Sequence, residues 1–305
     1  MHRRTFLSLP AVSILVTPAL ADSASRDLAS YYERHMALAA DGTAWSWSGR
    51  GVPQRQRGGV RQVGVSKDHC FALLDDGTLL AWADAPERAQ VLMRGVANFA
   101  AGHSGWFAID RAGVLWQASG LGGTPQRVAD GVATACIGDS ADYYVTRDAA
   151  LFVKGLAHRG QYGDGKLTES PVYLQTAADV VAVKAHTGHA IHLRRDGVVM
   201  GTGGNRYGPL SSHGLGDKAD RWGKLFDGAV AIATGSRHSL AIRADGSLWG
   251  WGEGFGITPV RLLVDVTGVA AGDTATIART RAGALWQWDG GGAPRRLAPS
   301  GASLR

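Results

Sequence analysis

Short stretches of alternating apolar and polar residues, joined by tight turns, recur along the chain. In the clearest copy, residues 231–252, a small-residue segment leads into a turn at Ser236 and Arg237, and the alternating sequence HSLAIR follows. Asp245 and Gly246 come next, a dipeptide typical of two-residue hairpins because glycine adopts a positive φ without strain. The segment SLWGWG completes the copy. The pattern predicts three short antiparallel strands per copy.

Seven copies of this unit align on the hairpin glycine. The anchor positions lie 35 to 49 residues apart and are Gly42, Gly77, Gly113, Ala149, Gly197, Gly246 and Gly283. A closing Pro-x-x-hydrophobic segment, such as Pro259 to Leu262, predicts a fourth strand. Repeats of this length are typical of propeller blades, because each small sheet must bury both faces against its neighbours. We therefore predict an all-β fold, a seven-bladed β-propeller of short antiparallel blades, with a β-solenoid or a sandwich as the alternative.

Certain side chains recur at fixed places in the copies. Eleven residues before the anchor stand Gly102, Gly138, Gly235 and Gly272, with Tyr31, Ser66 and His186 in the other copies. Three residues later stand His69, His189 and His238, and tryptophans follow the anchor in five copies. Identical placement puts these histidines on separate radial sheets, too dispersed for one tetrahedral metal ion. We expect the histidines to bond backbone groups between strands and the tryptophans to pack between blades.

The first residues predict an export signal. Two arginines precede a moderately apolar run from Phe6 to Val16, which is too short to span a bilayer, and Ala19 to Ala21 forms a small-x-small cleavage site. The segment from Arg3 to Leu7 looks like a twin-arginine signal, with an ordinary secretory signal as the alternative. We therefore predict a cleaved signal over residues 1–21, a single propeller domain over residues 22–305, and a periplasmic or extracellular protein.

Composition narrows the choice of partner. Loss of the two signal arginines would lower the formal net charge from +6 to +4, and no concentrated basic stripe is present, so we expect no nucleic-acid partner. Only 19% of the residues are charged, against 43 glycines and ten tryptophans, which argues against disorder. Cys70 and Cys136 lie in different copies at different strand positions, so we expect small buried thiols and no disulfide.

The copy at residues 235–252 reads G-x-x-H-S-L-A-x-x-x-D-G-x-L-W-x-W-G, and it resembles the repeat of the regulator of chromosome condensation family. Residues 160–163 are similar to that family's G-Q-L-G element, and residues 205–210 resemble it with proline in place of glutamine. The resemblance covers essentially all of the chain after the signal. It implies a seven-bladed ring but no particular activity, because one propeller fold carries unrelated functions.

Two activities known for such rings fit this chain poorly. The eukaryotic members of the family that it resembles act as nucleotide exchange factors for a nuclear GTPase, which an exported protein would not meet. An exported bacterial relative of the fold inhibits β-lactamases through aromatic side chains in the first turn of each blade. The corresponding turns here, such as Lys67 with Asp68 and Thr187 with Gly188, are polar and mostly small, so the resemblance does not favour this inhibitor.

Two copies carry about a dozen extra residues after the third strand, within residues 158–170 and 203–222. Because the strands alternate in direction, these loops should emerge on the same face as the first turns, opposite the Asp-Gly hairpins. Variable loops on a rigid scaffold commonly bind, so we predict that this loop face is the working face. The candidate binding residues are Lys67, Tyr162, Asp164, Arg206, Tyr207, His213, Arg221, Trp222 and Arg237. The alternative is that Tyr162, Tyr207 and Trp222 only pin the long loops to the ring.

No catalytic set stands out in the sequence. We found no D-x-D-x-D-G run for calcium, no nucleophile elbow, no paired zinc cysteines and no phosphate loop. We therefore predict a monomeric, non-enzymatic propeller without metal or cofactor, which binds a protein or an extracellular polymer, with a protein as the favoured partner. The alternatives are a lyase, hydrolase or cofactor-dependent oxidoreductase at the channel mouth, and a structural module of a larger envelope assembly.

Overall fold

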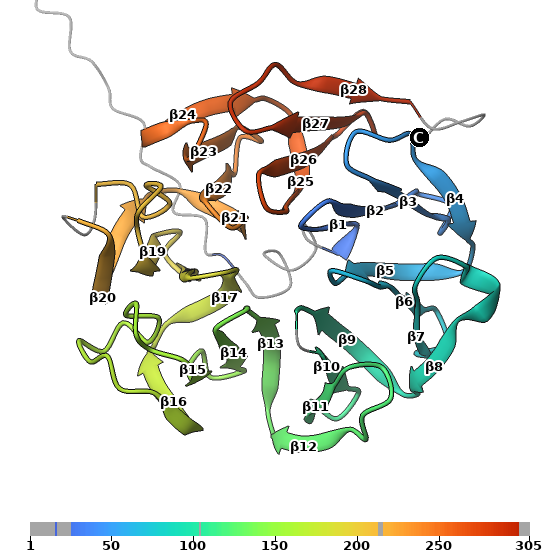
Figure 1. The fold of residues 1–305 in the computed structure, drawn as a ribbon, viewed down its shortest axis with the longest axis horizontal. Coiled ribbons are helices and arrows are strands. Elements are labelled where there is room, and N and C mark those ends of the chain that lie inside the picture. Colours follow the sequence, from blue (N-terminus) through green and yellow to red (C-terminus); the bar gives the residue numbers. More distant parts are fainter. Residues whose placement is uncertain (1–15, 17–25, 104, 213–215, 299–305) are drawn as a thin grey trace, which may run out of the picture.

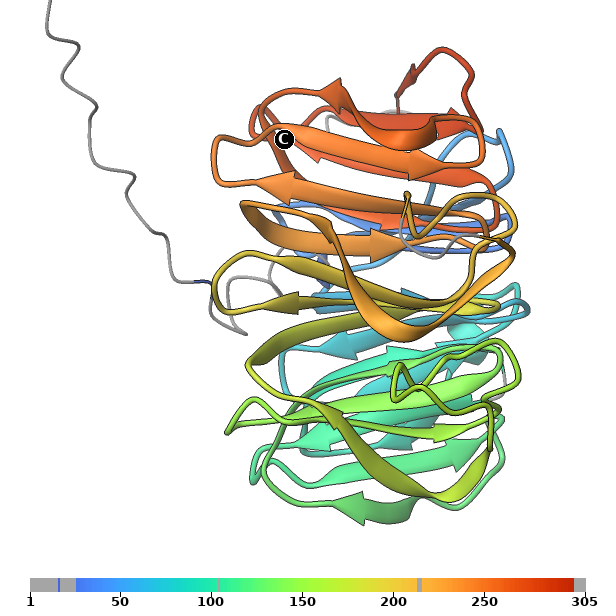
Figure 2. The same cartoon turned by 90° about the vertical axis from the view of Figure 1, so that its left-hand side faces the viewer.

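Seven four-stranded antiparallel sheets stand around a central axis and close into a ring (Figure 1). The computed structural model describes Val16 and residues 26–103, 105–212 and 216–298. Seen from the side, the blades form one layer in which the strands run across the thickness of the disc (Figure 2). The prediction of an all-β, seven-bladed propeller is confirmed, and a solenoid or sandwich is excluded.

The blades follow one another along the chain, and the first three occupy residues 28–129. Blade one contains β1 (Leu28–Tyr31), β2 (Arg34–Leu38), β3 (Ala44–Ser48) and β4 (Gln54–Arg57). Blade two contains β5 (Val60–Val65), β6 (Cys70–Leu74), β7 (Leu79–Trp82) and β8 (Gln90–Met93), with the 3-10 turn η1 (Pro86–Arg88) before β8. Blade three contains β9 (Val96–Ala101), β10 (Gly105–Asp110), β11 (Leu115–Ser119) and β12 (Gln126–Ala129).

The last four blades include the two long insertions. Blade four contains β13 (Val132–Ile137), β14 (Ala141–Thr146), β15 (Leu151–Gly155) and β16 (Ser170–Ala177). Blade five contains β17 (Val180–Ala185), β18 (His189–Arg194), β19 (Val199–Gly204) and β20 (Lys218–Phe226). Blade six contains β21 (Ala229–Thr234), β22 (His238–Arg243), β23 (Leu248–Gly252) and β24 (Gly256–Leu263). Blade seven contains β25 (Val266–Ala271), β26 (Ala275–Thr280), β27 (Leu285–Asp289) and β28 (Arg295–Leu297).

The anchor position of each copy forms the hairpin between the second and third strands. In blade six, Gly246 has φ +79° and its N–H donates to the Arg243 carbonyl oxygen at 2.9 Å. The Asp245 carboxylate accepts a hydrogen bond from the Ser247 backbone N–H at 2.8 Å. In blade four, Ala149 adopts the same left-handed conformation at φ 68°. The fourth copy therefore keeps the turn although its anchor residue is alanine. A non-glycine residue in this conformation costs of order 1 kcal/mol of conformational energy.

The core lies between neighbouring blades, where most of the recurring tryptophans pack as predicted. The buried ones are Trp45, Trp47, Trp82, Trp251 and Trp288, and the partly buried ones are Trp116, Trp249 and Trp286. Trp251 in β23 has no exposed surface and stacks on Phe226 of blade five, with ring centroids 5.7 Å apart. Trp47 of blade one is 5% exposed and belongs to a cluster with Ile277 and Leu285 of blade seven. Cys70 and Cys136 are buried free thiols, as the sequence predicted.

Side chains close the ring between blades seven and one, the red and blue blades that lie side by side in Figure 1. The last strand of the described chain, β28, pairs with β27 of its own blade, so the described part of residues 26–298 supplies no exchanged strand at the seam. The Trp47 indole N–H donates to Gln287 Oε1 at 3.1 Å, and Gln287 Nε2 donates to the Gly49 carbonyl oxygen at 2.9 Å. Arg279 reaches the Asp27 carboxylate at 3.2 Å and also donates to the Leu38 carbonyl oxygen. Packing and these polar contacts together hold the seam.

Buried histidines link successive blades. His189 Nε2 lies 3.1 Å from Ser239 Oγ of the next blade, and His238 Nε2 lies 2.9 Å from Thr276 Oγ1 of the blade after that. The expected structural role is confirmed for these two residues, but the expected partner was wrong. A hydroxyl on the neighbouring sheet takes the place of a backbone group, because the imidazole points out of its own sheet toward the next one.

Acidification should destabilise this ring. Burial lowers the histidine pKa from 6.5 to about 4 for His35 and His238 and to about 3 for His189 and His192. Between about pH 6.5 and 4 the unfolded state therefore binds more protons than the folded state, and each histidine lowers the free energy of unfolding by about 1.4 kcal/mol per pH unit. Burial also raises the Asp142 pKa to about 6, which offsets roughly one histidine in this window.

Urea unfolding at a series of pH values checks this expectation. The midpoint should fall steadily as the pH drops from about 7 to about 4, and His238→Gln should show a shallower pH dependence by about one proton. A midpoint that stays constant across this range would contradict the assignment of neutral buried histidines.

Candidate functional site

The inner strands end at the mouth of the central channel, where neighbouring main chains nearly touch. A Cβ on Gly235 would lie 2.3 Å from the Gly272 carbonyl oxygen, and one on Gly272 would lie 2.4 Å from the Tyr32 carbonyl oxygen. The Ser236 N–H donates to the Gly272 carbonyl oxygen at 3.1 Å across the same boundary. At Gly235 and Gly272 a side chain would therefore clash with the main chain of the next blade.

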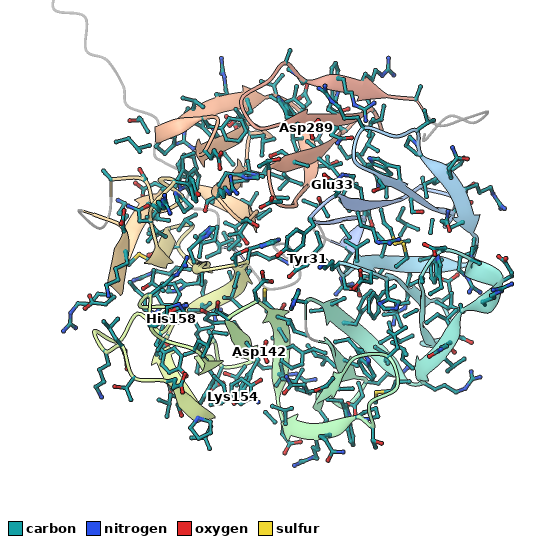
Figure 3. All side chains as sticks on the ribbon, in the orientation of Figure 1. Tyr31, Glu33, Asp142, Lys154, His158 and Asp289 are labelled. Atoms are coloured by element: carbon teal, nitrogen blue, oxygen red, sulfur yellow. The ribbon has the colours of Figure 1, made fainter. Side chains whose placement is uncertain are left out.

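Two copies place an aromatic ring where this glycine otherwise stands. Tyr31 ends β1, and its side chain lies at the centre of the ring (Figure 3). It stacks on His186 of blade five, with ring centroids 4.7 Å apart and an interplanar angle of 19°. Blades one and five are not neighbours, so this contact crosses the channel mouth.

A hydrogen-bond network surrounds these two rings. The Asp139 carboxylate of blade four accepts from the Tyr31 hydroxyl, from the Tyr32 hydroxyl at 3.4 Å, and from Thr187 Oγ1 at 3.2 Å. Thr187 Oγ1 also lies 3.0 Å from Ser236 Oγ of blade six. Four blades thus meet in one polar cluster, which we call the mouth network: Tyr31, Tyr32, Asp139, His186, Thr187 and Ser236.

The protonation states in this network follow from its contacts. The Thr187 backbone N–H donates to His186 Nδ1 at 3.0 Å, so the imidazole proton is assigned to Nε2. Burial lowers the His186 pKa more strongly than the nearby carboxylates raise it, so the ring is neutral at pH 7. Burial and the Asp139 carboxylate raise the Tyr31 pKa, which keeps its hydroxyl protonated as the donor to Asp139.

The network resembles a hydrolytic triad in composition but not in geometry. Ser236 Oγ lies 3.1 Å from His186 Nδ1. A triad needs a carboxylate on the other ring nitrogen to orient the imidazole, and His186 Nε2 has no hydrogen-bond partner among the described residues. Asp139 instead bonds Tyr31 and Thr187. This arrangement ties blades together and gives no support to a serine hydrolase.

The channel below the network is narrow. The inner strands of all seven blades enclose a cavity of about 160 Å³. Sites for drug-sized molecules are typically about 300–1,000 Å³, so this space does not fit an organic cofactor. Among the described residues, no group of three or more His, Cys, Asp or Glu side chains is placed to hold a metal ion.

A larger cavity opens on the loop face beside the channel mouth. It has a volume of about 570 Å³ and lies between the mouth network and the insertion of blade five. We call it the mouth pocket, and the residues that define it here are Arg159, Arg206, Tyr207, Lys218, Ser236 and Arg237. First-turn residues and insertion residues line it together, so the prediction that both emerge on one face is confirmed.

Three sequence-predicted site residues come together on the rim of this pocket. Tyr207 is 42% exposed, and the guanidinium groups of Arg237 and Arg206 lie over its ring at 4.7 and 5.7 Å from the centroid. Arg237 Nη1 also contacts both carboxylate oxygens of Glu253, at 3.0 and 3.2 Å. A second cavity of about 510 Å³, lined by Ile257 and Glu253, lies on the other side of Tyr207. We call Arg206, Tyr207 and Arg237 the loop-face ridge.

Tyr162 and Trp222 anchor structure instead of facing a partner. Tyr162 is fully buried, and its hydroxyl donates to the Gly155 carbonyl oxygen at 2.7 Å and accepts from the Ser170 N–H at 2.8 Å. Trp222 lies in β20, not in the loop, and packs on His192 with ring centroids 4.4 Å apart. The expectation that Tyr162 is displayed on the face was wrong, because its ring fills the space under the insertion of blade four.

The remaining candidates lie away from the ridge. Asp164 and Arg221 pair as an isolated antiparallel bridge that fastens the blade-four loop to blade five. Lys67 is exposed on the first turn of blade two and does not line the mouth pocket. His213 lies outside the described residues.

Most residues of the mouth network could not be predicted as a cluster from the sequence. Tyr31 and His186 carried a signal, since both replace a recurring glycine with a large ring. Asp139, Thr187 and Ser236 appeared only as small polar turn residues, and Arg159 as one charge in a loop. Nothing local to these residues shows that the curvature of the ring brings them together.

Comparisons with known proteins agree with this architecture. The family model of the Regulator of chromosome condensation (RCC1) repeat matches residues 229–255, which span the first three strands of blade six. The chain therefore carries an RCC1-type repeat and is similar to RCC1-repeat proteins. Blade six is thus the copy in which the RCC1 repeat is best preserved. Among the described residues, no helix of this RCC1-type propeller is long and apolar enough to cross a membrane.

Curated relatives match only part of their own length. The Secretion-regulating guanine nucleotide exchange factor of Bos taurus is 31% identical over 152 residues, which are 45% of this chain and 32% of that protein. The Ultraviolet-B receptor UVR8 of Arabidopsis thaliana is 22% identical over 209 residues, 64% of this chain and 41% of that protein. This RCC1-type chain therefore covers less than half the length of either relative.

Solved structures show the same fold at low sequence identity. Prp20p from Saccharomyces cerevisiae superposes with a TM-score of 0.68 and 18% identity, over 80% of each chain. The structure of Kap60 bound to yeast RCC1 (Prp20) matches with a TM-score of 0.74 and 16% identity, over 98% of this chain and 91% of that one. Identity this low shows the RCC1-type fold and no more.

The mouth network should contribute measurably to stability. Tyr31→Phe removes the hydroxyl that donates to Asp139 Oδ1, and we expect a loss of about 1–3 kcal/mol in the free energy of unfolding. Tyr32→Phe is the matched control, because its hydroxyl makes only the 3.4 Å contact with the same carboxylate and should cost less. Urea denaturation of both variants checks the order, and an equal or larger loss for Tyr32→Phe contradicts it.

Proposed function

We propose that this chain is an exported, non-enzymatic docking module that binds a protein partner on its loop face over blades five and six. The observation that carries the proposal is the loop-face ridge, an exposed tyrosine under two arginines with a cavity on each side. Tyrosine and arginine are enriched among residues that dominate protein interfaces, especially where they fit next to pockets.

The ridge is already held in place in the free protein. Glu253 orients Arg237 through two hydrogen bonds, and the Arg237 guanidinium packs over the Tyr207 ring in a cation–π contact. Ordering a flexible side chain on binding costs roughly 0.5–1.5 kcal/mol, so a ridge held in advance avoids part of that cost. Ile257, 59% exposed beside the ridge, adds apolar surface for a partner to cover.

Proteins of the same fold support a protein partner. Prp20p has binding properties toward Gsp1p and histones, and yeast RCC1 (Prp20) binds Kap60. Those partners belong to those proteins, and only the use of the ring as a docking surface carries over here. The small net charge without a basic stripe favours a protein over nucleic acid for this chain, and we propose that the docking unit is a monomer.

Site-specific photo-crosslinking in living cells tests the docking surface. A crosslinker at Tyr207 should yield a discrete protein adduct, whereas one at Val172, 61% exposed on the outer strand of blade four, should not. Tyr207→Ala should weaken capture of that partner about 30-fold or more, as loss of a hot-spot residue does, with no change in the unfolding midpoint. Absence of an adduct at position 207, or the same adduct at both positions, would count against the loop face. Tyr162 is unsuitable for this experiment because it is buried.

Export rests on the amino-terminal sequence. The Arg3-Arg4 pair, the short apolar run and the small-x-small site motivate the proposal of a cleaved twin-arginine signal. Replacing both arginines by lysine should leave the uncleaved chain in the cytoplasmic fraction, detected by immunoblot. Export that persists in this variant would point to the general secretory route, and a wild-type chain found uncleaved in the cytoplasm would overturn the proposal of export.

A further inference from the structure

The mouth pocket has an excess of positive charge that the protein itself does not neutralise. Four cationic side chains line it, Arg159, Arg206, Lys218 and Arg237, against the carboxylates of Asp217 and Asp273. Arg237 pairs with Glu253 at 3.0 Å. Within residues 26–103, 105–212 and 216–298, no carboxylate forms an ion pair with Arg159, Arg206 or Lys218. The cavity therefore presents three cations that have no anionic partner within the described part of the chain.

The structure leaves space for the Arg159 side chain at the edge of this cavity. It crosses from the blade-four loop to the first turn of blade five, where Gly188 has no side chain to block it. A Cβ on Gly188 would lie 3.0 Å from Arg159 Nη1, and one on Gly204 would lie 3.4 Å from Arg159 Cδ. Two glycines thus leave room for the guanidinium beside the pocket. A cation already positioned at the cavity loses less freedom when an anion binds.

From this geometry we propose that the mouth pocket binds a carboxylate of the protein partner, either an acidic side chain or a free carboxyl terminus. The inference rests on the proposed docking function and names the chemistry of the partner at that face. Guanidinium groups match carboxylates because their fork donates two parallel hydrogen bonds. The volume of about 570 Å³ has room for an acidic side chain together with neighbouring peptide atoms.

The lining also argues against a polyanion. Asp217 and Asp273 stand on the wall of the same cavity, so a chain of phosphates or sulfates would meet like charge where a single carboxylate would not. The apolar surface at Ile257 and the Tyr207 ring lies directly beside the pocket and suits the side chains that flank an acidic residue in a peptide. The hydroxyls of Thr187 and Ser236, held by the mouth network, line the same cavity and offer further hydrogen bonds.

Selection from a random peptide library tests the inference without knowledge of the natural partner. Two libraries are panned against the purified full chain, one displaying internal peptides and one with free carboxyl termini. We expect enrichment of Asp and Glu in the first library if side chains are bound, or of the second library over the first if a terminus is bound. Arg159→Glu should lose these peptides, and selection on that variant should shift toward lysine- and arginine-containing peptides.

The affinity of the purified full chain for a selected peptide then shows how much the carboxylate contributes to binding. Replacing its acidic residue by the matching amide, or amidating its carboxyl terminus, should weaken binding about tenfold or more, and Arg159→Gln in the protein should weaken it similarly. Lys166→Gln, a neutralisation at an exposed position of the same loop outside the pocket, is the control and should have no effect. The unfolding midpoint of each variant shows that the ring is intact.

The outcomes separate this inference from the docking proposal. Selected peptides without acidic bias, or equal binding by wild type and Arg159→Gln, overturn the carboxylate pocket. Stronger capture of inorganic phosphate or of a uronate oligosaccharide than of any peptide overturns it in favour of a free anion or a polymer. A crosslinked partner at Tyr207 whose capture is unchanged by Arg159→Gln leaves the docking proposal standing while the pocket fails. If acidic peptides bind but no cellular adduct forms at Tyr207, the carboxylate pocket stands while the docking proposal fails.

Discussion

The close approach of the inner strands is the constraint on which this structure depends. Adjacent main chains come almost into contact at the channel mouth between blades six and seven and between blades seven and one, where a Cβ at Gly235 or Gly272 would overlap a neighbouring carbonyl oxygen. Within the described residues, no exchanged strand locks the seam between blades seven and one. Contacts between blades therefore hold the ring: buried tryptophans supply contact area, buried histidines form hydrogen bonds to the next sheet, and main-chain bonds such as Ser236 N–H to the Gly272 carbonyl oxygen add to them.

The proposed docking surface lies where the repeats stop being identical. Replacement of glycine by Tyr31 and His186 fills the channel mouth and ties distant blades through Asp139. The insertions after the third strands of blades four and five lie beside the mouth network. The mouth pocket is the cavity between these insertions and the network. A narrow channel of about 160 Å³, with a pocket and a ridge on one face, suits recognition of a surface better than storage of a small molecule.

Burial decides the chemistry available at this mouth. The His186 imidazole is neutral and its Nδ1 is already an acceptor, so it acts as a structural group within the network. The charges that face solvent belong instead to residues of the insertions and first turns, which keep their hydration until something covers them. Arg206 and Arg237 beside Tyr207 combine this charge with an aromatic surface, a combination that favours protein recognition.

The sequence by itself determined the number of blades, the position of the hairpins and the face that carries the long loops, because these follow from local turn chemistry and from a period that repeats along the chain. It also predicted Arg206, Tyr207 and Arg237 as surface residues, because their places in a loop and a turn are local properties. Only the tertiary structure decided that Tyr162 is buried, that β28 stays in its own blade, and that Arg159, Thr187 and Ser236 share one cavity. These facts depend on how the ring curves and closes, which brings together residues from different repeats and so leaves no trace in any single one.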